Sequence, residues 1–316
     1  MNMATVVQTR RTPADYRWVR PPEWCPGCGH FGVLQAVYNA FAELDLDPSR
    51  VVLVSGIGCS SRLPHFVKTT SVHAIHGRAI PYAMGIKLAN PSLEVVVVGG
   101  DGDLMAIGGN HLLHMGRRNI DMTVILMDNS VYGLTRGQAG PTLPAGIKVK
   151  AIPKANPQSE INPLLLALTA GFTFIARGYS YDIKYTTKLI VEAIRHKGSA
   201  FVQIYSPCVT YNNVMTREWY EKRIYKLEEA DPTWDPVVHD EKEVDTKIRK
   251  ALDKIVERDR LPLGIFYKNE LVPTFEERYE AIYDPHYRKL PPAIQPIEVD
   301  GRPVVDLEKL LADRIL

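Results

Sequence analysis

The sequence predicts an α/β protein built on a doubly wound, mostly parallel sheet. Continuous apolar runs rich in β-branched residues recur along the chain, and segments with helical spacing separate them. The runs at 93–98 and 122–128, with the helical segment between them, have the pattern of a buried parallel β-α-β unit. Strands that alternate with helices in this way are typical of doubly wound sheets.

The other elements follow the same alternation along the chain. The expected strands cover residues 51–55, 93–98, 122–128, 172–176 and 200–205. The expected helices cover residues 31–44, 80–88, 163–170 and 183–196. A long loop containing four prolines fills about 132–158, and a loop of that length inside a compact domain is more often functional than idle.

Changes in composition suggest three parts. Residues 1–20 are polar and basic and are expected to form an N-terminal arm. Residues 21–230 carry the alternating pattern and are expected to form the cofactor-binding domain. Residues 231–316 are rich in proline and charge, with one amphipathic helix at about 241–258. We expect this last part to be a C-terminal extension that packs on a partner subunit.

The overall composition excludes several classes of function. Of 316 residues, 45% are hydrophobic and 23% are charged, as in an ordinary globular protein. The net charge of +2 and the absence of a Lys/Arg block argue against nucleic-acid binding. No apolar run has the length of a membrane span or of a secretory signal, so we expect a cytoplasmic protein. Four cysteines in such a chain indicate a metal or chemistry rather than disulfides.

Asp101 and Asn129 each follow one strand of the central β-α-β unit. The carboxyl ends of parallel strands share one edge, where open α/β sheets bind ligands. A carboxylate and an amide oxygen are hard ligands suited to Mg²⁺ that holds a phosphate-bearing cofactor. A dinucleotide-binding turn fits poorly, because Met105 occupies the place of its third glycine, and no Walker-type Gly-Lys-Ser/Thr follows. A turn that merely happens to be rich in Gly and Asp is the remaining alternative.

The cysteines point to the same edge of the sheet. Cys25 and Cys28 form a C-x-x-C pair, whereas Cys59 lies just past the first strand and Cys208 just past the last. An iron–sulfur cluster needs four thiolates and favours Gly- and Pro-rich loops, which turn N–H groups toward the sulfurs. Glycines and prolines do surround these cysteines. A zinc site, a thioredoxin-like redox pair and inert core cysteines are the alternatives.

Several motifs together resemble the β subunit of 2-oxoacid:ferredoxin oxidoreductases, which are thiamine diphosphate enzymes. The resemblance covers about residues 20–215 in register. It rests on Trp24-Cys25-Pro26-Gly27-Cys28-Gly29-His30, Gly56-Ile57-Gly58-Cys59-Ser60, His76-Gly77-Arg78, Gly100-Asp101-Gly102-Asp103 and Tyr132-Gly133-Leu134-Thr135, with Asn129 at the metal position.

The resemblance implies two metal sites and a cofactor site. A 4Fe–4S cluster would be held by Cys25, Cys28, Cys59 and Cys208, and Mg²⁺ by Asp101, Asn129 and the carbonyl of Val131. Thiamine diphosphate would be lined by Ile57, Gly58, Cys59, Ser60, His76, Asp101, Gly102, Asp103, Asn129, Val131, Gly133 and Leu134. Many relatives have Thr-Gly-Gly-Gln where this chain has Arg136 after Thr135. A cation at Arg136 is suited to a substrate carboxylate or a coenzyme A phosphate, or it simply faces solvent.

The implied activity is the oxidative decarboxylation of a 2-oxoacid such as pyruvate. Coenzyme A would accept the acyl group, and electrons would pass through the cluster to ferredoxin. The cofactor-activating glutamate would belong to an α (or fused α/γ) subunit, so we expect a heterodimer that is inactive without this partner. A non-oxidative thiamine diphosphate-dependent decarboxylase or carboligase is the alternative enzyme, but it leaves the four cysteines unexplained. A zinc-stapled binding module would leave Asp101 and Asn129 unexplained.

Overall fold

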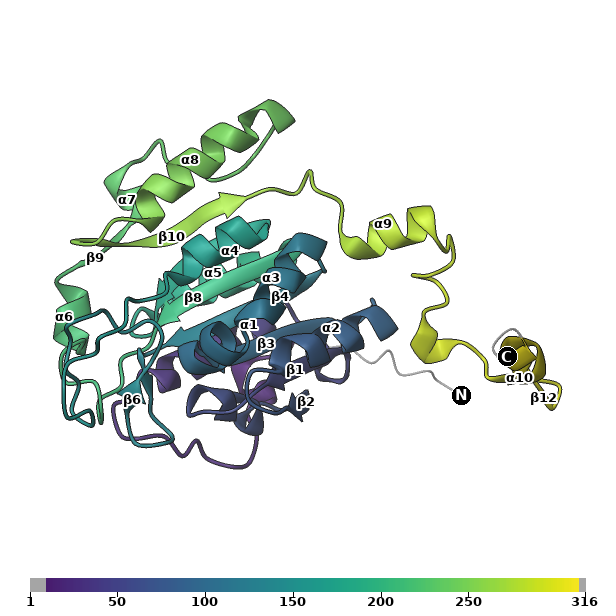
Figure 1. Cartoon of the computed structure of the whole chain (residues 1–316), viewed down its shortest axis with the longest axis horizontal. Helices are drawn as coiled ribbons and strands as arrows, with labels where there is room; N and C mark the ends of the chain where they lie inside the picture. The colour runs from purple at the N-terminus through teal and green to yellow at the C-terminus, as the bar shows by residue number, and fades with distance from the viewer. Residues whose placement is uncertain (1–9, 313–316) are drawn as a thin grey trace, which may run out of the picture.

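The computed structural model describes residues 10–312 and shows a sheet between two layers of helices (Figure 1). The sheet has eight strands in the order β2-β1-β3-β4-β8-β7-β10-β9. These strands are β1 (Val51–Ser55), β2 (Thr70–His73), β3 (Glu94–Gly100), β4 (Met122–Asp128), β7 (Phe174–Tyr179), β8 (Ser199–Tyr205), β9 (Ile224–Lys226) and β10 (Leu261–Lys268). Neighbouring strands from β2 through β7 are parallel, and β10 runs antiparallel to β7. The predicted doubly wound, mostly parallel sheet is therefore confirmed.

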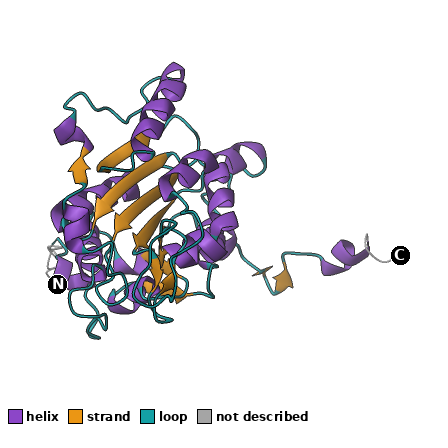
Figure 2. Ribbon diagram, turned by 60° about the vertical axis from the view of Figure 1, so that its left-hand side comes forward, coloured by secondary structure: helices purple, strands orange, loops and turns teal. Residues whose placement is uncertain are grey.

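Helices cover both faces of the sheet (Figure 2). The helices α1 (His30–Glu43) and α5 (Ile183–Arg195) pack on one face. The other face is covered by α2 (Ala79–Ala89), α3 (Gly109–Arg118), α4 (Pro163–Ala170) and α8 (Val244–Ile255). Successive strand residues alternate between the two cores: Leu53 faces the first and Val54 the second. Because both faces are buried, the strands are continuously apolar rather than alternating.

Three strands of the sheet, β2, β9 and β10, were not expected from the sequence. The edge strand β2 is short and largely exposed, so its residues carry no apolar signal. Strand β10 contains Pro262 and Gly264, residues that usually argue against a strand, and it lies within charge-rich sequence. Strands β9 and β10 pair with each other across the expected boundary near residue 230. The sheet therefore continues into the proposed C-terminal extension.

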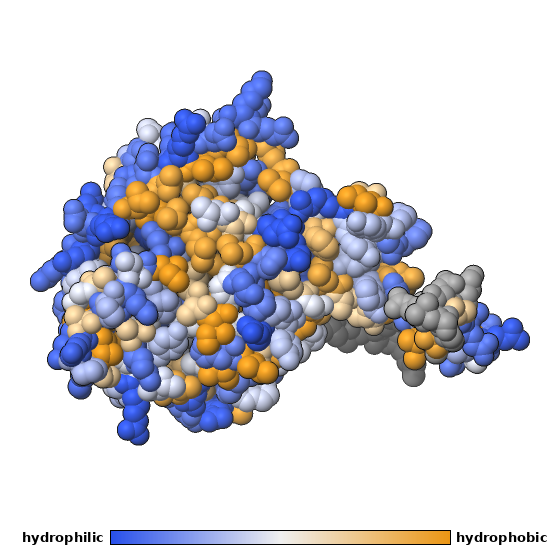
Figure 3. Space-filling model, viewed as in Figure 1, coloured by the Kyte–Doolittle hydropathy of each residue, from blue (hydrophilic) through white to orange (hydrophobic). Residues whose placement is uncertain are grey.

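The chain beyond β10 leaves the body of the molecule in steps. Helix α9 (Phe275–Ile282) follows, and the Tyr287 hydroxyl donates a hydrogen bond to the Leu88 carbonyl at the end of α2. Beyond Pro292–Ile294 the chain projects outward as the short pair β11 (Glu298–Val299) and β12 (Arg302–Pro303), followed by α10 (Leu307–Ala312). Apolar surface is visible on this projecting arm (Figure 3). The exposed large apolar side chains of this part of the chain include Ile294, Ile297, Val299, Val304 and Val305.

The described part of the N-terminal arm is anchored to the domain. A short 3-10 turn, Pro13–Tyr16, places the Tyr16 ring in the core, where its hydroxyl donates hydrogen bonds to the carbonyls of Phe41 and Leu46. The first nine residues of the expected arm lie outside the described residues. Between residues 10 and 312, no helix is both long enough and apolar enough to cross a bilayer.

Candidate active site

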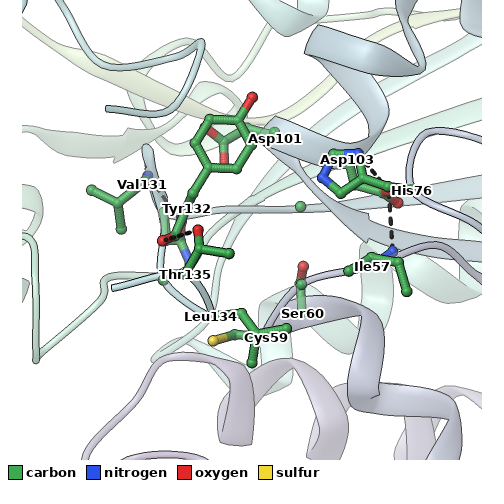
Figure 4. A pocket seen from close by; sticks show the side chains of 15 residues that line it. Ile57, Cys59, Ser60, His76, Asp101, Asp103, Val131, Tyr132, Leu134 and Thr135 are labelled. Carbon is green, nitrogen blue, oxygen red and sulfur yellow. Dashed lines mark hydrogen bonds and ion pairs between the residues drawn. The ribbon is translucent and has the colours of Figure 1, made fainter. Parts of the chain in front are cut away.

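One cavity lies at the carboxyl edge of the sheet, beyond the ends of β1, β3 and β4 (Figure 4). It brings together all twelve residues that the resemblance assigns to the cofactor, from four separate segments of the chain. Gly100, Tyr132 and Thr135 also line it. Tyr132 begins one of the motifs that carry the resemblance but was not assigned to the cofactor; its ring stacks on His76 with centroids 6.3 Å apart.

Asp103 ties together the turns that form this cavity. Its Oδ1 accepts hydrogen bonds from the backbone N–H groups of Ile57 at 3.1 Å and Gly77 at 2.7 Å. The Nδ1 of His76 lies 3.7 Å from the same oxygen. Burial raises the pKa of the Asp103 carboxyl, and the two backbone donors oppose that rise. The Oδ2 of Asp103 and the Nδ1 of His76 are buried without a hydrogen-bond partner among the described residues.

Asp101 and Asn129 end adjacent strands, because Gly100 of β3 pairs with Met127 of β4. Both side chains are buried. Asn129 Oδ1 accepts a hydrogen bond from the Val131 N–H, while the Val131 carbonyl accepts one from the Gly133 N–H. Ser130 between them has a φ of 61°, which is uncommon for a residue other than glycine. This tight turn brings the three expected Mg²⁺ ligands to one cavity.

A buried polar network runs from Asp101 back into the sheet. The Thr142 hydroxyl contacts Asp101 Oδ2 at 3.0 Å and Asp128 Oδ1 at 2.6 Å. Gln203 donates to Asp128 Oδ2 at 2.7 Å and accepts from Arg177 Nε at 2.9 Å. Burial and the neighbouring Asp128 charge raise the pKa of Asp101. A cation beside Asp101 would therefore offset the free-energy cost of burying its ionised carboxylate.

At two positions of this site a neighbouring side chain lies so close to the backbone that only glycine fits. A Cβ on Gly102 would overlap the Tyr132 ring, and a Cβ on Gly56 would overlap the Asp103 carboxylate. Gly102 begins a six-residue π-helical turn, Gly102–Ile107, before α3. Such turns are rare and frequently occur at functional sites.

The four cysteines line a second cavity of about 200 Å³. Direct contacts join their loops: Trp24 Nε1 donates to the Cys59 carbonyl at 2.7 Å, and the Gly29 N–H donates to the Pro207 carbonyl at 3.3 Å. A Cβ on Gly133 would lie 3.3 Å from the Cys59 sulfur. Segments almost 180 residues apart in sequence therefore enclose one space.

The cysteine side chains differ in burial: Cys25 is exposed, whereas Cys28, Cys59 and Cys208 are partly buried. All four are free, and burial raises the pKa of Cys28 to about 12 and that of Cys59 to about 11. The backbone N–H of His30 opposes the rise at Cys28 by hydrogen bonding to the thiol. Within residues 10–312, no three His, Cys, Asp or Glu side chains are grouped closely enough to hold a single metal ion. The four cysteines share this cavity as lining residues.

Arg136 lies apart from these two cavities. It is exposed at the tip of the hairpin formed by β5 (Val131–Tyr132) and β6 (Gln138–Ala139) and does not line either space. Its φ is 83°, an uncommon value for a residue with a side chain. Its neighbour Thr135 does line the cofactor cavity.

The sequence is similar to those of known proteins. Residues 56–204 match the thiamine pyrophosphate enzyme C-terminal TPP-binding domain, and residues 208–284 match the C-terminal family of the pyruvate ferredoxin oxidoreductase β subunit. A 2-oxoacid:ferredoxin oxidoreductase β subunit from Saccharolobus solfataricus is 54% identical over 92% of this chain and 96% of its own length. A β subunit of the same name, numbered 2, from Aeropyrum pernix is 50% identical over 97% of this chain and 99% of its own length.

A solved structure is also similar. It is a 2-oxoglutarate:ferredoxin oxidoreductase from Magnetococcus marinus with 2-oxoglutarate, coenzyme A and succinyl-CoA bound. The TM-score is 0.81 and the sequence identity 37%, and the match covers 97% of each chain.

Proposed function

Because this chain belongs to the β subunits of the 2-oxoacid:ferredoxin oxidoreductases, we propose that it holds Mg²⁺–thiamine diphosphate beside a 4Fe–4S cluster. One observation carries the proposal: the cofactor cavity and the cysteine cavity share a wall made of Cys59, Asn129, Gly133 and Leu134. Groups bound in the two spaces would be neighbours.

The residues of the first cavity fit a metal-bound diphosphate. Asp101 and Asn129 offer the oxygens that Mg²⁺ prefers, and the Val131 carbonyl is the third candidate ligand. Asp103 Oδ2 and His76 Nδ1 have no hydrogen-bond partner among the described residues, as expected of a wall that contacts a polar ligand. Asp103 itself orders the Ile57 and Gly77 turns.

The residues of the second cavity fit a cluster better than a single ion. Four thiols that line one open space suit a multi-atom cluster, whereas zinc requires thiolates that converge on one point at about 2.3 Å. Burial raises the pKa of Cys28 and of Cys59, so holding them as thiolates requires a nearby positive charge. Iron bound to Cys25, Cys28, Cys59 and Cys208 would supply it.

The proposed reaction oxidises a 2-oxoacid with loss of CO₂. Thiamine diphosphate bound by these residues would supply a nucleophilic carbon and an electron sink for the decarboxylation. This oxidation needs an adjacent centre that accepts electrons one at a time. A non-oxidative decarboxylase or carboligase does not need such a centre. Coenzyme A is the proposed acyl acceptor and ferredoxin the proposed electron acceptor; the names of the related enzymes support both.

A partner chain is part of the proposal. Leu134 on the cavity wall is exposed, and so are Ile107 and, next to His76 in the chain, Ile75. Ile107 lies against Gly77, next to His76. An apolar rim around a polar cavity marks an interaction surface. We place the α (or fused α/γ) subunit there and retain the proposals that residues 231–316 pack on a partner and that the protein is cytoplasmic.

Arg136 is proposed to meet an anionic group of the substrate or of coenzyme A. The support is its strained backbone, its exposure and the position of Thr135 on the cavity wall. Replacing it, as Arg136→Ala, should raise the KM for the 2-oxoacid or for coenzyme A and leave the cofactor affinity unchanged. An unchanged KM for both would show that Arg136 is an ordinary surface residue.

The function is tested on the complex purified without oxygen. The complex should reduce ferredoxin while releasing CO₂ from a 2-oxoacid, with pyruvate and 2-oxoglutarate tested first, and the rate should depend on coenzyme A. Release of CO₂ with aldehyde or carboligation products and no ferredoxin reduction would favour the non-oxidative alternative. A colourless protein with bound zinc and no turnover would contradict both enzyme assignments.

A further inference from the structure

His30 stands at the start of α1, between the C-x-x-C loop and the end of β8. Its side chain is fully buried. The ring packs edge-on against Trp24, with centroids 5.5 Å apart, and its Nδ1 lies 2.7 Å from the Ser206 hydroxyl. Trp24 and Ser206 are in turn fixed by backbone groups, since Trp24 donates to the Cys59 carbonyl and the Ser206 N–H donates to the Asp128 carbonyl. The ring is therefore held in one orientation.

The other ring nitrogen is left without a partner. His30 Nε2 is buried and makes no hydrogen bond with any described residue. His30 also lines the cysteine cavity, together with Cys25, Cys28 and the two remaining cysteines. An unpaired buried polar atom is costly in a folded protein. A ligand in this cavity would give Nε2 the partner that the described residues do not.

The contents of the cavity decide which ring nitrogen carries the proton. A neutral imidazole donates from one nitrogen and accepts at the other. Thiolate and sulfide sulfurs offer only acceptors, so Nε2 must be the donor when they fill the cavity. Nδ1 then accepts from the Ser206 hydroxyl, which can donate because no other acceptor for it is found among the described residues. The Ser206 contact thus selects the tautomer that points an N–H at the cavity.

We propose that His30 Nε2–H donates a hydrogen bond to a sulfur of the cluster, with Ser206 positioning the ring, and so raises the reduction potential of the cluster. This inference rests on the cluster assigned under the proposed function. A hydrogen bond to sulfur stabilises the negative charge that reduction adds, and such bonds are among the determinants of cluster potential.

The test is a redox titration of the cluster in the intact complex, followed by its visible absorbance and electron paramagnetic resonance. His30→Phe keeps an aromatic ring and removes the donor, and its midpoint potential should shift to a more negative value. His30→Gln retains an N–H donor and should restore part of the potential. Ser206→Ala should shift the potential in the same direction as His30→Phe but less. The control His114→Gln, on the exposed face of α3, should titrate as the wild type does.

Iron content separates the possible outcomes. Wild-type protein without iron would overturn the proposed function itself, not only the role of His30. A His30→Phe variant with full iron and an unchanged potential would overturn the inference. If His30→Phe assembles no cluster, Ser206→Ala decides, because it keeps the imidazole and removes only the contact at Nδ1. An unchanged potential in Ser206→Ala would then count against the inference.

Discussion

The Thr142 hydroxyl stands between two buried carboxylates, 3.0 Å from Asp101 Oδ2 and 2.6 Å from Asp128 Oδ1. It comes from the long loop after β4, so this loop closes over the sheet edge and reaches the proposed metal ligand. Through Asp128 and Gln203 the contact continues to the buried Arg177. The orientation of Asp101 thus depends on residues three strands away.

Thr142→Val should destabilise the protein and weaken Mg²⁺–cofactor binding. Valine has almost the same shape but leaves the buried carboxylates without their shared hydroxyl, which costs about 1–3 kcal/mol. The measurements are denaturant unfolding and calorimetric titration of the complex. The control Thr169→Val alters an exposed hydroxyl that bonds only to its own helix and should change stability by less than about 0.5 kcal/mol. Equal behaviour of the two variants would show that the network has no such role.

Asp103 should act as a hydrogen-bond acceptor for two backbone groups. Asp103→Ala leaves the Ile57 and Gly77 N–H groups without their acceptor. We expect the affinity for Mg²⁺–thiamine diphosphate to fall about tenfold or more, or ~1.4 kcal/mol. Asp103→Asn keeps an oxygen in the same place and should retain most of the affinity. An Asn variant as weak as the Ala variant would instead indicate that the carboxylate charge is needed.

Gly102 should tolerate no side chain. Gly102→Ala places a Cβ into the Tyr132 ring, and we expect a loss of about 1–3 kcal/mol in stability together with weaker cofactor binding. Gly109→Ala is the matched control, because a Cβ at this helical glycine meets no atom within 4 Å. Thermal unfolding and cofactor titration of both variants provide the comparison. A Gly102→Ala protein that unfolds and binds like Gly109→Ala would rule out the close packing of Tyr132.

The sequence was sufficient to predict the central strands and the convergence of the motifs. Strands β1, β3, β4 and β8 are continuous apolar runs, and their shared direction brings Cys59, Asp101, Asn129 and Cys208 to the same edge without further information. That these residues bind a cofactor and a cluster stays a prediction. Strand β2 could not be recognised, because an exposed edge strand lacks the apolar signal.

The buried network could not be predicted in the same way. The apolar strands contain or end in isolated polar residues, namely Arg177, Gln203 and Asp128. Each stands out in the sequence as a buried polar residue, but the sequence does not show which side chain it bonds to. Their contacts follow from strand register: Arg177 lies opposite Gln203 on neighbouring strands. The Thr142 contact depends on the path of an irregular loop, which no local periodicity describes.

Glu94 should make stability depend on pH. Burial raises its pKa to about 7, from an ordinary value near 4.5. The folded state then binds more protons than the unfolded state between these two values, so stability falls as the pH rises through this window and levels off above it. Glu94→Gln should reduce that decline by about 1–3 kcal/mol. Urea unfolding from pH 5 to pH 8 measures this dependence of the free energy of unfolding on pH, and Glu241→Gln, at an exposed position, is the control. Parallel curves for wild type and Glu94→Gln would contradict the shift.

The iron content of Cys208→Ala tests the central claim most directly. Cys208 lies on the cysteine cavity but does not line the cofactor cavity. In the complex purified without oxygen, the variant should lose the brown absorbance and ~4 iron atoms per β chain. Its affinity for Mg²⁺–thiamine diphosphate should stay close to that of the wild type. Undiminished iron in this variant would contradict the account.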